Sequence, residues 1–156
     1  MFKECEKLTS EIRIIPVLGI PLIKEGDNLA KIIFDRIELQ DNDIIVSCET
    51  VFSNAQGRLV DINRINPSIK AKDISKKTGK DPRLVQLILD ESKEGLKIGD
   101  SVIVVETKDG NIWASAGIDV SNVCGNTSIV GLLQIDPDKE AAKIRLALKK
   151  SSKKEW

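Results

Sequence analysis

The fold class is decided by the stretch VIVVETKDGNIWASAGIDVSN, residues 102–122. Two apolar runs at 102–106 and 112–116 flank Lys-Asp-Gly-Asn at 108–111, and a polar, Gly-containing turn between β-rich runs predicts a hairpin. Helical patterns stand before and after this hairpin, and strands and helices do not alternate regularly along the chain. We therefore predict an α+β fold in which helices pack on a mixed or antiparallel sheet.

The helical patterns carry clear boundary signals. A helix is predicted from Pro67-Ser68 to Lys77, with Gly79 as its stop. Asp81-Pro82 begins a second helix, because Asp is a good N-cap and Pro fits the first helical turn. The apolar face of this helix is predicted to hold Leu84, Val85, Ile88 and Leu89. A last helix follows Asp136-Pro137-Asp138.

The first third of the chain is predicted to add two strands and one helix. Branched apolar residues at 12–17 indicate a strand, and those at 44–48 with 51–52 indicate a buried strand. Between them, apolar residues from Leu29 to Ile37 recur at helical spacing, with Asp27 as the expected N-cap. A short strand is expected again at 59–62. The organisation we predict is one α+β domain over residues 1–148, followed by a basic, frayed tail over 149–156.

Composition excludes several classes of function. The 156 residues include 24 Lys and Arg and 24 Asp and Glu, so the zero net charge gives no bulk attraction to nucleic acid or to an anionic membrane. No apolar run reaches membrane-spanning length and no signal-peptide core is evident, so we expect a cytoplasmic protein. The chain has no His, which excludes triads that need one, and its three Cys match neither a disulfide framework nor a zinc site. A bound metal therefore needs oxygen ligands, which favours Mg, Mn or Ca.

Three polar or Gly-containing segments are candidate ligand sites. Gly117 lets a ligand approach the backbone, Asp119 offers hard oxygen to a divalent cation, and Asn122 donates and accepts hydrogen bonds. The alternative for this segment is an Asx turn that closes the hairpin. The loop at 19–23 offers backbone amides to a phosphate or a flat surface to a purine, or simply reverses the chain. The segment at 48–57 offers small hydroxyl and amide groups to a nucleotide, or simply ends a strand.

The order and spacing of several short segments carry a further signal. These segments are GIPLIKEGD at 19–27, VFSNAQGR at 51–58, NPS at 66–68, GKDP at 79–82, LDES at 89–92, AGIDVSNV at 116–123 and DPD at 136–138. Together they resemble the coenzyme F420-0:gamma-glutamyl ligase family, from about Ile14 to Leu148. That family joins glutamate through an amide bond to a carboxylate of a deazaflavin coenzyme precursor, at the expense of GTP. Activation of the carboxylate as an acyl phosphate is implied.

The resemblance implies a set of binding residues but no catalytic residue. The nucleotide would be lined by Ile20, Pro21, Leu22 and Ile23 and contacted by Thr50 and Asn122, and Asp119 would bind Mg or Mn. The implied ligands are GTP, the deazaflavin precursor and glutamate, and the implied assembly is a homodimer with an α+β fold. Neither nucleic acid nor a membrane is an expected partner.

Two departures from the family pattern bear on activity. Where the family has Ser-Lys-Ala-Glu-Gly, this chain has Ser53-Asn54-Ala55-Gln56-Gly57, so a phosphate-facing Lys is replaced by Asn54 and a carboxylate by Gln56. The lost ammonium–phosphate pair is worth roughly 1.5–3 kcal/mol. The family also continues beyond the matched region with an Asp-Thr box that completes the metal site and an arginine-rich segment.

Three hypotheses follow from the resemblance and the departures. The chain is a ligase-like domain that acts when a second polypeptide supplies the missing half, or a non-catalytic relative that binds nucleotide or deazaflavin or regulates, or an interaction protein built on the dimer surface. We expect a ligase homologue that is inactive or very weak by itself.

Overall fold

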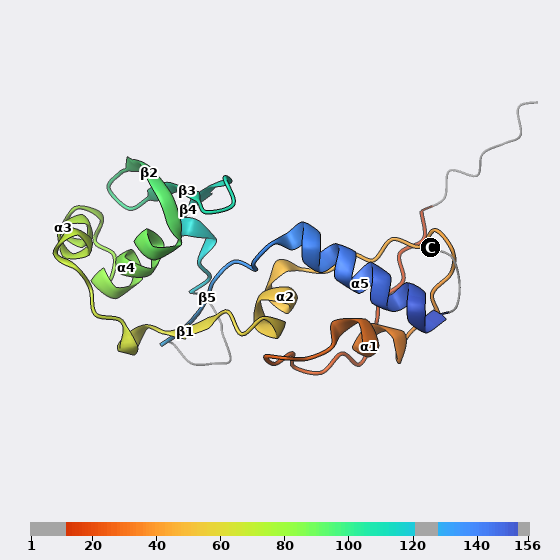
Figure 1. Ribbon diagram of the computed structural model, residues 1–156. Coiled ribbons are helices and arrows are strands. Elements are labelled where there is room, and N and C mark those ends of the chain that lie inside the picture. The colour runs from red at the N-terminus through yellow and green to blue at the C-terminus, as the bar shows by residue number, and fades with distance from the viewer. Residues whose placement is uncertain (1–11, 121–127, 153–156) are drawn as a thin grey trace, which may run out of the picture.

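The computed structural model describes residues 12–120 and 128–152, and its architecture is α+β, as predicted. Along the chain the elements are α1 (Leu29–Phe34), α2 (Glu49–Ala55), β1 (Leu59–Asp61), the 3-10 turn η1 (Ile62–Arg64), α3 (Ile69–Thr78), α4 (Pro82–Glu91), β2 (Ser92–Ile98), β3 (Ile103–Thr107), β4 (Ile112–Ala114), the 3-10 turn η2 (Ser115–Gly117), β5 (Ile129–Gly131) and α5 (Pro137–Ser152). One end of the molecule holds α3, α4 and strands β2 to β4, and the other end holds α1 and α5 (Figure 1). Helix α2 and the β1–β5 pair lie between the two ends.

Two antiparallel sheets form among the described residues. Strands β2, β3 and β4 are hydrogen-bonded in that order, and Val105 at the centre of β3 stands opposite Gly95 of β2 and Trp113 of β4. The predicted hairpin is therefore confirmed. Strand β2 was not predicted, because its sequence SKEGLKI contains three charged residues and its apolar alternation is limited to Leu96 and Ile98. Strands β1 and β5 pair separately, with Leu59 opposite Gly131.

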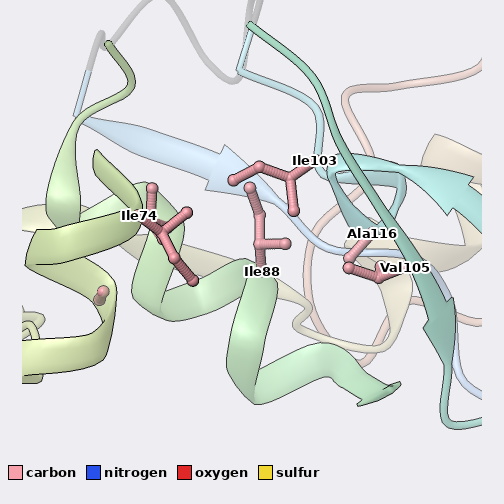
Figure 2. Packing of buried hydrophobic residues seen from close by; sticks show 7 residues of the cluster. Ile74, Ile88, Ile103, Val105 and Ala116 are labelled. Atoms are coloured by element: carbon pink, nitrogen blue, oxygen red, sulfur yellow. The ribbon is translucent and has the colours of Figure 1, made fainter. Parts of the chain in front are cut away.

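The hydrophobic core lies at the α3–α4 end of the molecule. Its buried members come from two helices, the central strand and the turn after the hairpin: Ala71, Ile74, Val85, Ile88, Ile103, Val105 and Ala116 (Figure 2). Val85 and Ile88 are spaced three apart on α4, and Ile103 and Val105 alternate on β3, so one helical stripe packs on one face of the strand. The predicted apolar face of this helix is confirmed, since Leu84 and Leu89 pack against the same cluster.

Helix boundaries follow the predicted signals closely. The Ser68 hydroxyl accepts a hydrogen bond from the Ala71 amide at 3.2 Å, and Gly79 ends α3 in the left-handed conformation. Asp81 and Asp136 accept from the amides of Arg83 and Lys139 at 2.8 and 3.1 Å, which caps α4 and α5.

Two boundary details differ from the prediction. The N-cap of α1 is Asn28, whose side chain accepts from the Lys31 amide at 3.0 Å, because Asp27 instead accepts from the Lys24 amide at 2.8 Å and closes the preceding turn. Helix α5 continues to Ser152, past the predicted end of the domain at residue 148. None of the helices among the described residues is long and apolar enough to cross a membrane.

The two strands predicted in the first third of the chain are wrong. Residues 12–17 and 44–48 have no regular secondary structure and are largely exposed, and residues 51–52 belong to α2. Their β-branched composition favours a strand, but a strand forms only where a neighbour satisfies its backbone groups. Within the described ranges, no such neighbour reaches them.

Candidate functional site

Gly117, the glycine of the predicted ligand segment, packs closely against another side chain of the protein. Ser115, Ala116 and Gly117 have φ values of +52°, +54° and +67°, so three successive residues adopt the left-handed conformation. A Cβ atom on Gly117 would lie 2.6 Å from Cδ1 of Leu133. On the side where a Cβ atom would lie, the close approach that Gly117 permits is therefore to a side chain of the same protein, and the approach of a ligand to this backbone stays a prediction.

Asp119 lies just beyond this turn with an exposed side chain. The Asp119 amide donates to the Gly131 carbonyl and the Gly131 amide donates to the Asp119 carbonyl, both at 2.9 Å. Since β1 pairs with one edge of β5, Asp119 pairs with the opposite edge. Asp119 therefore lies in an antiparallel bridge, and its carboxylate is held at the surface by strand-like pairing.

The metal prediction rests on Asp119 by itself. Among the described residues, no group of three or more acidic or Cys side chains is arranged to hold a metal ion. One exposed carboxylate does not form a protein-only cation site, but Mg²⁺ is commonly held by one or two carboxylates together with substrate phosphates. A role of Asp119 as one such carboxylate stays a prediction.

Asn122, the second predicted ligand-binding residue of this segment, lies outside the described residues. Its contact with a nucleotide stays a prediction.

The predicted nucleotide loop at 19–23 has both exposed and buried side chains, and a hydrogen bond fixes its first residue. Ile20 and Leu22 are 43% and 67% exposed and Pro21 is also exposed, whereas Ile23 is only 7% exposed and belongs to the interior. The loop is oriented by the Gly19 carbonyl, which accepts a hydrogen bond from Nε of Arg36 at 2.8 Å. Three of the four predicted lining residues are thus accessible to a ligand.

Thr50 and the segment around it form helix α2, where a strand exit was predicted. Thr50 is exposed in the first turn of the helix. The C-terminal end of α2 contacts the turn after the 19–23 loop, because the Gly26 amide donates to the Ala55 carbonyl at 2.9 Å. The structure therefore places the turn that follows the 19–23 loop beside the C-terminal end of α2.

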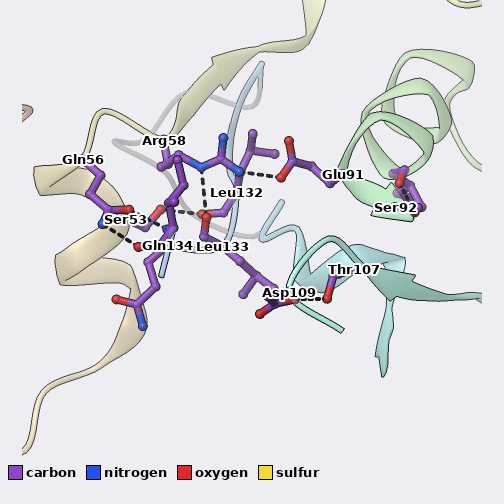
Figure 3. A network of polar contacts seen from close by, with 12 residues as sticks. Ser53, Gln56, Arg58, Glu91, Ser92, Thr107, Asp109, Leu132, Leu133 and Gln134 are labelled. Atoms are coloured by element: carbon purple, nitrogen blue, oxygen red, sulfur yellow. Dashed lines mark hydrogen bonds and ion pairs between the residues drawn. The ribbon is translucent and has the colours of Figure 1, made fainter. Parts of the chain in front are cut away.

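Polar side chains from α2 and the segment after it hold residues 132–135 by their backbone (Figure 3). Ser53 donates to the Leu132 carbonyl at 2.5 Å, Arg58 donates through Nε to the Leu133 carbonyl at 3.0 Å, and Glu49 accepts from the Gln134 amide at 2.9 Å. We name these contacts, together with those of Gln56 described next, the 132–135 clamp.

Gln56 completes the clamp with two hydrogen bonds to one residue. Its Nε2 donates to the Ile135 carbonyl at 2.9 Å, and its Oε1 accepts from the Ile135 amide at 2.6 Å. The amide side chain supplies both the donor and the acceptor that this pairing requires. Sequence reasoning missed this role because the partner lies 79 positions away and only the fold brings it close.

Arg58 connects the clamp to the α4 end of the molecule. Its Nη2 lies 2.5 Å from the Glu91 carboxylate, and both side chains are about one-fifth exposed, at 19% and 22%. Asn54, which stands where the family has a lysine, has its Oδ1 buried without a hydrogen-bond partner among the described residues. The two residues that depart from the family pattern thus face the protein interior or its backbone.

The clear pKa shifts among the described carboxyls lie away from these segments. A hydrogen bond from the Arg83 side chain holds the pKa of Asp81 below its usual value, and hydrogen bonds from Thr107 and Asn111 lower the pKa of Asp109. Both carboxyls stabilise local structure, the first as a helix cap and the second in the hairpin turn.

Replacing Gln56 by Glu tests the clamp. The carboxylate cannot donate to the Ile135 carbonyl and places negative charge against it, so we expect the free energy of unfolding to fall by about 1–2 kcal/mol. Urea denaturation measures the change, and Gln40→Glu, at an exposed position outside the clamp, serves as the matched control. Equal stability of the two variants would show that the Gln56 contacts contribute nothing.

Comparison with known proteins gives the family. The model of the F420-0:Gamma-glutamyl ligase family matches residues 18–156. The chain is 42% identical over 134 residues to a protein of Archaeoglobus fulgidus named coenzyme F420:L-glutamate ligase, with 86% of this chain and 53% of that protein covered. Proteins of the same name from Methanothermobacter thermautotrophicus and Methanocaldococcus jannaschii are 42% and 41% identical, each with 92% of this chain and 58% and 57% of the relative covered. The chain thus spans a little over half the length of these relatives, and it belongs to the F420-0:gamma-glutamyl ligase family.

Proposed function

We propose that the chain carries the nucleotide-facing part of a coenzyme F420:L-glutamate ligase and supports GTP- and metal-dependent gamma-glutamyl ligation when the rest of the ligase is supplied. The observation that carries this proposal is the identity of 41–42% over 86–92% of the chain to relatives named for that activity. A second polypeptide or a continuation of the chain would supply the remainder, and the assembly would be a homodimer acting in the cytoplasm.

The accessible side chains support this assignment. Ile20, Pro21 and Leu22 offer an apolar surface to a purine, and Thr50 offers an exposed hydroxyl to phosphate or sugar. The Asp119 carboxylate offers one oxygen ligand to Mg²⁺ or Mn²⁺ already held by phosphates. A metal bound there would neutralise the charge of the phosphates during acyl transfer.

A second candidate function is a non-catalytic module that binds nucleotide or deazaflavin. Gln56 and Asn54 favour it, because the first is engaged by the Ile135 backbone and the second places an amide where the family has a lysine. An amide lacks the full positive charge that stabilises a transferring phosphoryl group.

Thermal unfolding with GTP tests both candidates. A ligand present at 100 times its dissociation constant stabilises the folded state by about 2.7 kcal/mol, which raises the melting temperature of a chain of this size by roughly 5–10 °C. We expect this rise with GTP and Mn²⁺, and we expect Asp119→Ala to remove the metal-dependent part. Asp100→Ala, at another exposed carboxylate, should leave the shift unchanged.

The pattern of shifts separates the candidates. A shift with GTP that neither Mn²⁺ nor Asp119→Ala alters would favour the binding module and contradict metal-dependent ligation. Absence of any shift at millimolar GTP would exclude nucleotide binding by this chain and leave deazaflavin binding, which near-ultraviolet absorbance of the purified protein would reveal.

A further inference from the structure

Residues 62–118 have a hydrophobic core of their own, and we name them the lobe. The buried cluster that joins α3, α4 and β3 lies entirely within these residues, and Ile118 at their end packs against it. Among the described residues, every pair of helices and strands that packs extensively lies either wholly inside the lobe or wholly outside it. The lobe forms one end of the molecule, next to β1 and β5 (Figure 1).

The chain enters and leaves the lobe beside one strand. The lobe begins after Asp61 of β1 and ends before Asp119, and these two residues belong to segments that pair with opposite edges of β5. The two junctions are therefore the Asp61–Ile62 and Ile118–Asp119 peptides. At the first of them, the Ile62 amide donates to the Ser128 carbonyl at 2.9 Å, across the boundary of the lobe.

We propose that the two junctions are a hinge about which the lobe moves, and that the Arg58–Glu91 ion pair is the latch that holds the lobe closed. A unit with its own core is expected to move relative to its neighbour unless a large apolar interface joins the two. The described helices and strands form no such interface across this boundary. Motion of packed units takes place at a few residues where the elements end, as at these junctions.

The latch joins the lobe to the segment beside it. Glu91 is the last residue of α4, inside the lobe, whereas Arg58 precedes β1, outside it. Nε of Arg58 donates to the Leu133 carbonyl, which also lies outside the lobe, and Nη2 of the same guanidinium donates to Glu91 (Figure 3). Because Arg58 is held from outside, movement of the lobe separates Glu91 from it. Closure is therefore stabilised by an ion pair that solvent screens only in part.

Amide hydrogen exchange of the full chain, followed residue by residue by NMR, tests the hinge. Glu91→Ala should speed exchange of the Ile62 and Asp119 amides, at the two junctions, roughly tenfold, because the lobe opens more often without its latch. The amides of Ile74 and Ile88, inside α3 and α4, should keep their rates, since the lobe stays folded as it moves. No ligand is added, so the result is independent of the proposed function.

Glu106→Ala is the matched control. Glu106 is 25% exposed, close to the 22% of Glu91, and it pairs with Lys93 at 2.7 Å inside the lobe. The variant thus removes a similarly exposed carboxylate and one ion pair without changing the boundary. Exchange at the two junctions should equal that of the unmodified chain.

Arg58→Ala removes the latch from its other side. It also removes the contact with Leu133, so it should speed exchange at the junctions at least as much as Glu91→Ala does. The double variant should be no faster than Arg58→Ala, because both substitutions break the same pair. Unchanged exchange at the junctions in Glu91→Ala, or the same acceleration in Glu106→Ala, would overturn the latch. Equal acceleration at the junctions and inside α3 and α4 would show that the chain opens as one unit and would overturn the hinge.

Discussion

Replacing Ile88 by Ala is expected to lower the free energy of unfolding by about 2–5 kcal/mol, a large share of the stability of a domain of this size. Ile88 has no exposed surface and belongs to the cluster that joins α3, α4 and β3. The substitution removes buried methyl groups and leaves a cavity that the surrounding helices and strand fill only in part. Urea or thermal denaturation measures the loss.

Ile69→Ala is the matched control for this prediction. It removes the same atoms from α3 at a position that is 79% exposed, so the expected change is within about 0.5 kcal/mol. If Ile88→Ala were as mild as Ile69→Ala, the cluster would not be the stabilising core of the molecule.

Replacing Gly117 by Ala is expected to lower the free energy of unfolding by roughly 2–5 kcal/mol, from two separate causes. The residue has φ of +67°, a conformation that a side chain with a Cβ atom adopts only with strain. The new Cβ would also lie 2.6 Å from Leu133 Cδ1, so the turn or the Leu133 side chain must shift. Chemical denaturation of the single variant gives the total effect.

Gly79 separates the two causes. It has φ of +70°, and a Cβ atom added there would meet no atom within 4 Å, so Gly79→Ala carries only the backbone strain, about 1–2 kcal/mol. In a Leu133→Ala background, the effect of Gly117→Ala should fall toward that of Gly79→Ala. Equal effects of Gly117→Ala with and without Leu133 would show that the close approach has no energetic consequence.

The predicted helices succeeded because their signals are local. Ser68, Asp81 and Asp136 accept hydrogen bonds from amides two or three residues away, and Gly79 ends its helix by its own backbone conformation. The polar turn of the β3–β4 hairpin is equally local. Such signals act within a few residues, so one sequence is sufficient to locate them.

The prediction of strands at 12–17 and 44–48 was wrong because composition indicates only which structure the residues favour. Whether a β-branched run becomes a strand depends on a neighbour that pairs with it, and that neighbour is supplied by tertiary or quaternary structure. At β2 a strand formed that was not predicted. Charged residues such as Glu94 and Lys97 do not favour a strand, but the segment forms one by pairing with β3.

Some parts of the candidate site could be identified from the sequence, and others only from the structure. Asp119, Thr50 and the exposed part of the 19–23 loop could be named from their chemistry and from the family resemblance. The 132–135 clamp could not, since Ser53, Gln56 and Arg58 meet their partners across 75–79 positions of sequence. Nothing near these residues in the chain shows that their polar groups are already engaged.

The sequence by itself determined the family, the α+β class, the boundaries of α3 and the start of α4, and the identity of the polar groups available to a ligand, because these depend on residue type and short-range spacing. The tertiary structure alone decided that Leu133 occupies the space above Gly117, that Gln56 binds the Ile135 backbone, and that two β-rich runs stay exposed. The physical reason is that packing and backbone pairing join residues far apart in the chain, and no local pattern specifies which distant groups will meet.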